Sequence, residues 1–128
     1  MRLLKFILYF ILCCPIIASA QRYNYSNYNI SNGLPNNQVN KILQDRVGRL
    51  WVATMSGVVK FDGKTFVPFE SGNLLSSNPV KTVYEDKKGN IWFGTIRKGL
   101  VKYSGTGFSY FTSNEGLLSD IVNAVCED

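Results

Sequence analysis

The chain has 128 residues, of which 45% are hydrophobic and 13% aromatic, and its formal net charge is +5. This composition excludes an intrinsically disordered chain, because disorder requires low hydrophobicity and few aromatic residues. The sequence has no histidine, which excludes Ser-His-Asp and Cys-His catalytic arrangements and histidine metal sites from this segment.

The first 20 residues have the three parts of a secretory signal peptide. Arg2 and Lys5 precede an apolar stretch over Phe6–Ile17, and a small-x-small pattern ends at Ala20. We expect cleavage after Ala20, which leaves Gln21 as the mature start. The apolar stretch is shorter than the roughly 20 residues that a membrane-spanning helix needs.

Two alternatives remain open for this leader: a retained N-terminal helix, or a lipid anchor on Cys13 or Cys14. Without the leader the net charge falls to +3, and Cys126 is the single cysteine left, so we expect no internal disulfide. We expect Cys126 to be a buried apolar thiol. No run of basic residues exceeds two, so the sequence predicts no nucleic-acid partner.

Residues 21–32 precede an internal repeat of 41 to 42 residues that fills the rest of the chain. Positions that recur at these spacings are Leu34, Leu75 and Leu117; Val39, Val80 and Val122; Asp45, Asp86 and Asp128; Gly48 and Gly89; Trp51 and Trp92; Phe69 and Phe111. An ordered series of this kind indicates repeated structural units.

Each repeat divides into four short β segments. They cover residues 39–43, 50–53, 57–61 and 65–69 in the first repeat, and 80–85, 91–94, 99–103 and 107–111 in the second. Asp45–Gly48 and Asp86–Gly89 have the Asp and Gly positions of a type I turn that ends in a left-handed glycine. No stretch shows helical periodicity with caps.

Repeated units of four short antiparallel strands predict an all-β fold, the β-propeller. We expect blade 1 over residues 33–72, blade 2 over 73–114, and the start of a truncated third blade over 115–128. Trp51 and Trp92 are expected to pack between blades. Two complete blades are fewer than the roughly four to eight of a closed ring, so we expect a fragment of a longer protein.

The segment Tyr23–Ile30 precedes blade 1 with the aromatic spacing of a fourth strand. Tyr25 and Tyr28 lie 14 and 11 residues before Val39, as Phe66 and Phe69 lie before Val80. The spacing predicts that residues 21–32 hold an outermost strand that completes the last blade and closes the ring.

Polar residues precede each inner strand, where propellers commonly bind ligands near the central channel. Asn37, Asn78 and Asp120 occupy the same repeat position, and we expect them to bind a hydroxyl-rich ligand. Turn formation is the alternative, since Asn and Asp are ordinary turn residues. Asp45 and Asp86 are assigned to turns, and the sequence predicts no catalytic residue, metal site or cofactor.

A known family shares these motifs. The stretch Tyr84–Thr95, YEDKKGNIWFGT, continued by Gly99–Tyr103, GLVKY, closely resembles the two-component regulator propeller repeat. The copy over Gln44–Thr54 and Gly57–Phe61 is similar, with departures at Gln44, Arg49 and Ala53. The links over residues 33–39 and 116–122 resemble those of the family, so the resemblance covers essentially all of the mature chain.

The resemblance implies an exported, non-catalytic sensor propeller on the periplasmic side of the inner membrane, in a hybrid two-component histidine kinase. It implies a membrane tether and kinase downstream, and an oligosaccharide or other small molecule as ligand; a homodimer is compatible with it. Two alternatives remain: a secreted propeller enzyme acting on polysaccharide, and a surface binding or scaffold propeller. Function has to be argued from sites, because one fold serves many functions.

Overall fold

The structure is a computed structural model that describes residues 2–3, 23–69 and 75–128. The expected signal peptide lies outside these ranges, apart from Arg2 and Leu3, as does its cleavage point between Ala20 and Gln21. Within the described ranges, no helix is both long enough and apolar enough to span a membrane.

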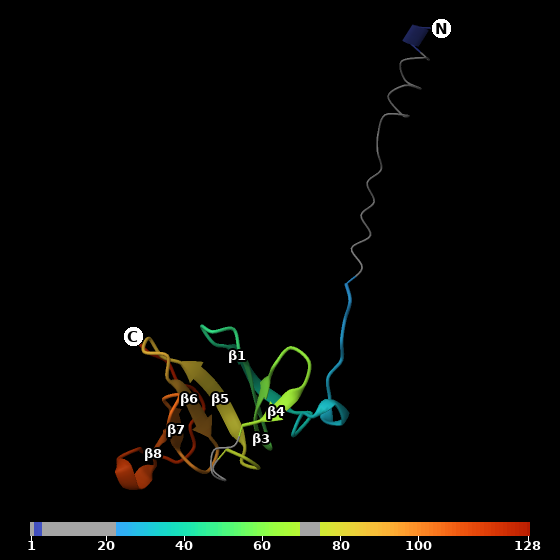
Figure 1. Cartoon of the computed structure of the whole chain (residues 1–128). Coiled ribbons are helices and arrows are strands. Elements are labelled where there is room, and N and C mark those ends of the chain that lie inside the picture. The colour runs from blue at the N-terminus through green and yellow to red at the C-terminus, as the bar shows by residue number, and fades with distance from the viewer. Residues whose placement is uncertain (1, 4–22, 70–74) are drawn as a thin grey trace.

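Two four-stranded antiparallel sheets make up the fold, which confirms the expected all-β class and its propeller blades (Figure 1). The first sheet, blade 1, contains β1 (Val39–Gln44), β2 (Leu50–Thr54), β3 (Gly57–Phe61) and β4 (Phe66–Pro68). The second sheet, blade 2, contains β5 (Val80–Glu85), β6 (Ile91–Thr95), β7 (Leu100–Tyr103) and β8 (Phe108–Phe111). Strands are adjacent in chain order, as in an antiparallel meander.

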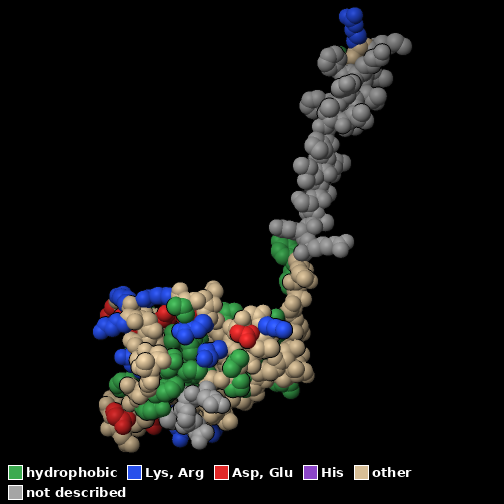
Figure 2. Space-filling view, viewed as in Figure 1, with side chains coloured by type: hydrophobic (Ala, Val, Ile, Leu, Met, Phe, Trp, Pro, Cys, Tyr) green, Lys and Arg blue, Asp and Glu red, His purple; other side chains and the backbone are tan. Residues whose placement is uncertain are grey.

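The first hairpin of each blade turns on an aspartate and a glycine. The Gly48 amide donates to the Asp45 carbonyl at 2.9 Å, and the Gly89 amide donates to the Asp86 carbonyl at 3.0 Å. Gly48 and Gly89 have φ angles of +86° and +82°, which are strained for residues with a Cβ. We call the end of the blades that carries these two turns the turn face; Lys and Arg side chains gather there (Figure 2).

The main core lies between the two blades, where β1 and β5 run side by side. Trp51 is fully buried and meets Phe69 edge-on, with ring centroids 4.7 Å apart, and Phe93 of blade 2 at 5.6 Å. Val80 and Val83 of β5 are buried in the same cluster. The two sheets stabilise each other, because either sheet alone would leave its apolar face exposed to water.

Hydrogen bonds also join the blades along the turn face. The Arg46 amide donates to the Glu85 carboxylate at 2.9 Å, and the Arg46 guanidinium donates to the carbonyls of Asp86 and Lys87, each at 2.8 Å. One repeat later the Lys87 amide donates to the Glu127 carboxylate at 2.7 Å. Successive repeats are therefore joined by the same contact.

Residues 120–128 lie along blade 2 without forming a strand. The Val122 amide donates to the Thr95 carbonyl at 2.8 Å, so this stretch starts beside blade 2 as a next inner strand would. Cys126 is exposed, contrary to the expectation of a buried thiol, because no further sheet covers this stretch in the chain.

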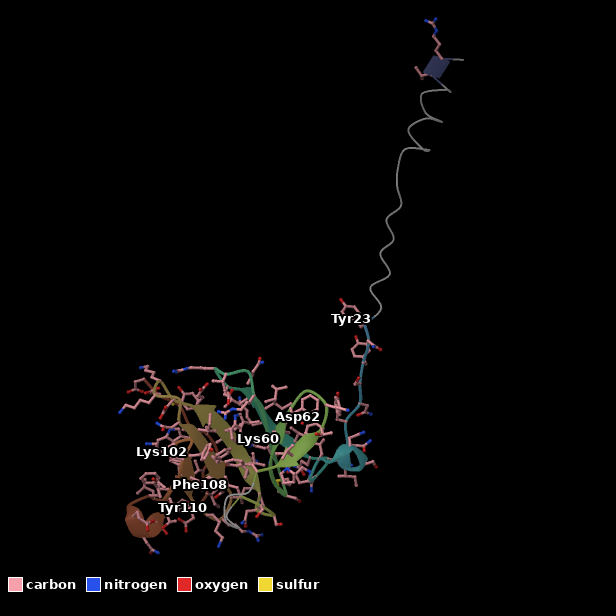
Figure 3. All side chains as sticks on the ribbon, viewed as in Figure 1. Tyr23, Lys60, Asp62, Lys102, Phe108 and Tyr110 are labelled. Carbon is pink, nitrogen blue, oxygen red and sulfur yellow. The ribbon has the colours of Figure 1, made fainter. Side chains whose placement is uncertain are left out.

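The N-terminal segment does not form the expected strand within this chain. Tyr23–Asn29 belongs to no strand, and Ile30–Asn32 forms a short 3-10 helix, η1, in place of the end of that strand. Tyr28 packs on Phe61 and Phe66 of blade 1, but the start of the segment extends away, with Tyr23 far from both sheets (Figures 1 and 3). Neither sheet of the described residues pairs with Tyr23–Asn29, so ring closure by this segment stays a prediction.

Candidate functional site

The candidate site lies at the end of the blades opposite the turn face, where links lead into the inner strands. We call this end the link face. The first link, residues 29–38, begins with η1, and the link at residues 112–121 begins with a second 3-10 helix, η2 (Ser113–Glu115). Both helices have a capping box at the N-terminus, and each ends on a left-handed glycine, Gly33 or Gly116.

Two of the three expected ligand-binding residues hold these helices in place. The Asn37 side-chain oxygen accepts from the Ile30 amide at 3.0 Å, and the Asp120 carboxylate accepts from the Ser113 amide at 2.7 Å. Asn37 is exposed and Asp120 is half-buried. Both side chains therefore fix the first turn of a link, which is a structural role; contact with a ligand stays a prediction for both.

Asn78 occupies the same repeat position in the second link, where it is half-buried. Residues 70–74 of that link lie outside the described residues. The structure therefore does not show whether the second link repeats the helix cap of the other two, and the expected ligand contact of Asn78 stays a prediction.

A shallow cavity of about 230 Å³ opens beside the first link. Gly33 and Pro35 line it from the link, Ser56 from the hairpin between β2 and β3, and Ser76 and Ser77 from the second link. Val59 and Phe69 supply part of an apolar wall. An apolar wall with a few convergent hydroxyl groups is typical of small-molecule sites.

Hydrogen bonds hold the polar rim of this cavity. The Asn36 side-chain amide donates to the Ser56 hydroxyl at 3.1 Å, and the Ser77 amide donates to the Ser56 carbonyl at 3.2 Å. Ser77 has a φ of +67°, an uncommon conformation for a residue with a Cβ. A non-glycine residue in this region marks a backbone that its surroundings constrain.

Ser56 is not among the site residues predicted from the sequence. The sequence gives little indication that Ser56 belongs to the site, because Ser56 follows β2 in a hairpin with an ordinary turn sequence. Only the fold brings that hairpin against the second link, where an antiparallel bridge joins Gly57 to Ser76.

The turn face carries the ionisable groups with the clearest electrostatic perturbation. Partial burial raises the pKa of Asp45, but hydrogen bonds from the Trp51 indole and from Arg49 outweigh it and hold the pKa below its ordinary value. Hydrogen bonds from Asn90 and Trp92 likewise outweigh desolvation and lower the pKa of Asp86. Both groups are carboxylates at neutral pH, in keeping with a role as acceptors in the turns.

A cation–aromatic contact repeats at the equivalent position of each blade. The Lys60 ammonium lies 5.8 Å from the Trp51 ring centre, and the Lys102 ammonium lies 5.3 Å from that of Trp92. Lys102 pairs with Ser109 of β8, so it lies on the opposite face of blade 2 from Phe108 and Tyr110, the other residues labelled on this blade in Figure 3. The side chains of these lysines cover indole surface that would otherwise be exposed to water, and thereby stabilise the stacking of blades.

Within residues 2–3, 23–69 and 75–128, no three His, Cys, Asp or Glu side chains gather closely enough to hold a metal ion. The exposed hydroxyl and amide groups of the link face can donate and accept hydrogen bonds.

Comparisons with known proteins agree with this fold. The family described as two component regulator propeller matches residues 33–56 and 74–97. Histidine kinase P4 of Formosa agariphila is 37% identical over 60 residues, a match that spans 47% of this chain and 4% of that protein.

Two solved structures are similar. The extracellular domain assigned to a hybrid two component system of B. thetaiotaomicron is 32% identical, with a TM-score of 0.63, over 75% of this chain and 15% of that one. PorZ of Porphyromonas gingivalis, a surface component of the type-IX secretion system, is 19% identical with a TM-score of 0.55, over 67% of this chain and 14% of that one, and shows the fold alone. The chain thus spans a small part of each of these proteins.

Proposed function

From the premise that this chain carries two-component regulator propeller repeats, we propose that it is part of the exported ligand-sensing propeller of a two-component signalling receptor. The observation that carries the proposal is the likeness, at 32% identity, to the extracellular domain of a hybrid two component system.

The proposed ligand is a hydroxyl-rich small molecule, with an oligosaccharide as the first candidate. The link face offers the groups that such a ligand needs: the Ser56 and Ser76 hydroxyls, the Asn37 amide, and an apolar wall that includes Phe69. Hydroxyls and amides donate and accept hydrogen bonds, as recognition of a hydroxyl-rich ligand requires.

The receptor architecture is part of the same proposal. The leader over residues 1–20 directs export, a membrane tether follows the propeller, and a histidine kinase lies on the other side of the membrane. The match to histidine kinase P4 supports this arrangement, although it spans only 4% of that protein.

Asn37 offers a test that separates ligand binding from folding. Asp120 shows that a carboxylate caps the equivalent link over residues 112–121, so Asn37→Asp keeps the acceptor, removes the donor group and adds a negative charge. Asn37→Ala removes both. The experiment measures binding of a panel of oligosaccharides to the receptor's whole exported region by calorimetry, with circular dichroism as the folding check.

We expect one class of oligosaccharide to bind, and Asn37→Asp to weaken that binding about tenfold while leaving the fold intact. Loss of binding in Asn37→Ala alone would restrict Asn37 to its structural role. Failure of every oligosaccharide to bind would overturn the glycan proposal, and a receptor with no downstream kinase would overturn the signalling role.

A further inference from the structure

Blade 2 carries exposed cations at link-face positions where blade 1 is neutral. Ser56, in the hairpin between β2 and β3, corresponds to Arg97 in the hairpin between β6 and β7. The second hairpin is one residue longer and also contains Lys98. Arg97 and Lys98 are both exposed, and Figure 2 shows Lys and Arg side chains at this lower end of the molecule as well as at the turn face. The same hairpin of the repeat therefore presents a hydroxyl group on blade 1 and two positive charges on blade 2.

The backbone of the cationic hairpin is fixed at its base. The buried Thr95 hydroxyl donates to the Gly99 carbonyl at 2.9 Å and accepts from the Lys98 amide at 2.8 Å. The Gly99 amide donates to the Asp120 carbonyl at 2.9 Å, which joins the hairpin to the link at residues 112–121. The two cationic side chains thus extend from a constrained turn, so little backbone freedom is lost when they bind an anion.

A third cation, Lys81, lies near the link-face end of β5. It occupies the β-bulge between Val80 and Thr82 and is exposed. A bulge redirects a side chain out of the regular alternation of its strand. The equivalent bulge residue of β1 is Asn40, whose side-chain amide donates to the Val80 carbonyl at 2.8 Å. Blade 1 is therefore neutral at this position also, and the positive charge belongs to blade 2.

The carboxylates nearby are engaged in the fold. Among the described residues of the link face, the acidic side chains are Glu115 and Asp120. The Glu115 carboxylate accepts from the Thr112 amide at 2.7 Å, and the Asp120 carboxylate accepts from the Ser113 amide at 2.7 Å. In the part of the chain that the structure describes, none of the three cationic side chains takes part in a hydrogen bond or an ion pair. The three cations are therefore available to a ligand.

The other two arginines of the blades have structural roles, which Arg97 lacks. The Arg46 guanidinium donates to two carbonyls of the next blade, each at 2.8 Å. The Arg49 guanidinium pairs with the Asp45 carboxylate at 2.6 Å. Stabilisation of the fold thus explains the arginines of the turn face and leaves the arginine of the link face without a structural explanation.

The cationic hairpin lies beside the link that also lines the cavity of blade 1. The Ile96 amide donates to the Pro79 carbonyl at 3.1 Å, which holds this hairpin against the end of the second link. The same link supplies Ser76 and Ser77 to the cavity. The two residues of chain from Ser77 to Pro79 span at most about 7 Å. One oligosaccharide can therefore contact the hydroxyl groups and the cations together.

We infer that Lys81, Arg97 and Lys98 bind the acid group of an oligosaccharide, so that the ligand of the link face is an acidic sugar chain with carboxylate or sulfate groups. This inference rests on the proposed recognition of an oligosaccharide and narrows its class. An arginine guanidinium donates paired hydrogen bonds to an oxyanion, and a lysine adds a compact positive charge. The serines and amides of the link face are left to bind the sugar hydroxyls.

Calorimetry on the full-length receptor in detergent tests the charge of the ligand. The probes form two pairs: oligogalacturonate with its methyl ester, and a sulfated galactan oligosaccharide with its desulfated form. Each pair differs in the acid group, so the pair that responds identifies carboxylate or sulfate. We expect the acidic member of one pair to bind at least roughly tenfold more tightly than its neutral member. Its binding should weaken as sodium chloride is raised, because salt screens exposed charges.

Two double variants test the residues. Arg97→Gln with Lys98→Gln removes two charges from the link face. The matched control, Lys64→Gln with Lys88→Gln, removes two charges from exposed turns at the other end of the blades. We expect the first variant to bind the acidic probe about tenfold or more weakly, and the control to change binding less than about twofold. Unchanged thermal unfolding shows that both variants fold.

Three outcomes would overturn the inference. Equal losses in the two double variants would show that only net charge matters. A neutral probe that binds as tightly as its acidic partner would overturn the acidic class and leave the proposed sensor function standing. Failure of every oligosaccharide, acidic and neutral, would overturn both proposals together.

Discussion

The indole Nε1 of Trp51 donates a 2.9 Å hydrogen bond to the Asp45 carboxylate, which ties the second strand of the blade to the turn before it. Trp92 and Asp86 repeat the bond at 2.8 Å. Each carboxylate also accepts two backbone amides of its own turn. One side chain therefore fixes the turn and orients the tryptophan that packs between blades.

Asp45→Ala is expected to lower the free energy of unfolding by about 1–3 kcal/mol, because it leaves the buried Trp51 indole and the turn amides without an acceptor. Urea unfolding monitored by Trp fluorescence measures the change. The matched control is Lys64→Ala in an exposed turn, for which we expect a change within about 0.5 kcal/mol. Equal effects of the two variants would contradict the role assigned to Asp45.

Stability is expected to fall as pH is lowered into the acid range. The folded-state pKa of Asp45 and of Asp86 is depressed, so their contribution is complete above the unfolded value of about 3.9 and is lost as pH falls toward the folded value. Asp86→Asn mimics the protonated group. The difference in unfolding free energy between the native protein and this variant should be constant near neutral pH and shrink below about pH 4. Urea unfolding across this range gives the result, and a difference that does not shrink would contradict it.

Trp51→Ala is expected to cost more than Trp92→Ala in this chain. Trp51 is fully buried between the blades and contacts Phe69 and Phe93, whereas Trp92 is half-buried and stacks on Phe111 of its own sheet. Truncation of a buried tryptophan costs about 3–5 kcal/mol, and we expect a smaller loss for Trp92. Thermal unfolding of both variants checks the order. In a protein with a complete third blade the two costs should converge.

Gly99 and Gly105 both have left-handed backbones, so alanine substitutions at these two positions distinguish the cost of backbone strain from the cost of a steric clash. A Cβ on Gly105 meets no atom within 4 Å, while a Cβ on Gly99 lies 2.1 Å from the Phe111 carbonyl oxygen. Gly105→Ala should cost about 1–2 kcal/mol for its backbone alone. Gly99→Ala should cost about 1–3 kcal/mol more, because β8 has to move. Urea unfolding of the two variants gives the comparison, and equal costs would show that β8 adjusts freely.

Several features of the candidate site could not be predicted from the sequence. Asn37 and Asp120 were identified by their repeat position, but their hydrogen bonds span seven residues and depend on a 3-10 helix that no periodicity predicts. Ser56 joins the site only because the fold places its hairpin against the second link. The Trp51–Asp45 bond depends on side-chain direction across a hairpin, which residue spacing does not specify.

The sequence by itself determined the class of fold, the number of strands in each blade and the position of the turns. These are local properties: alternating apolar residues, turn residues such as Asp45 and Gly48, and a repeat that shows the same pattern twice. The tertiary structure decided which faces are buried, why Trp51 is enclosed while Ile42 is open, and where Tyr28 lies. Burial depends on which sheet packs against which, and that is decided by contacts between residues about forty positions apart.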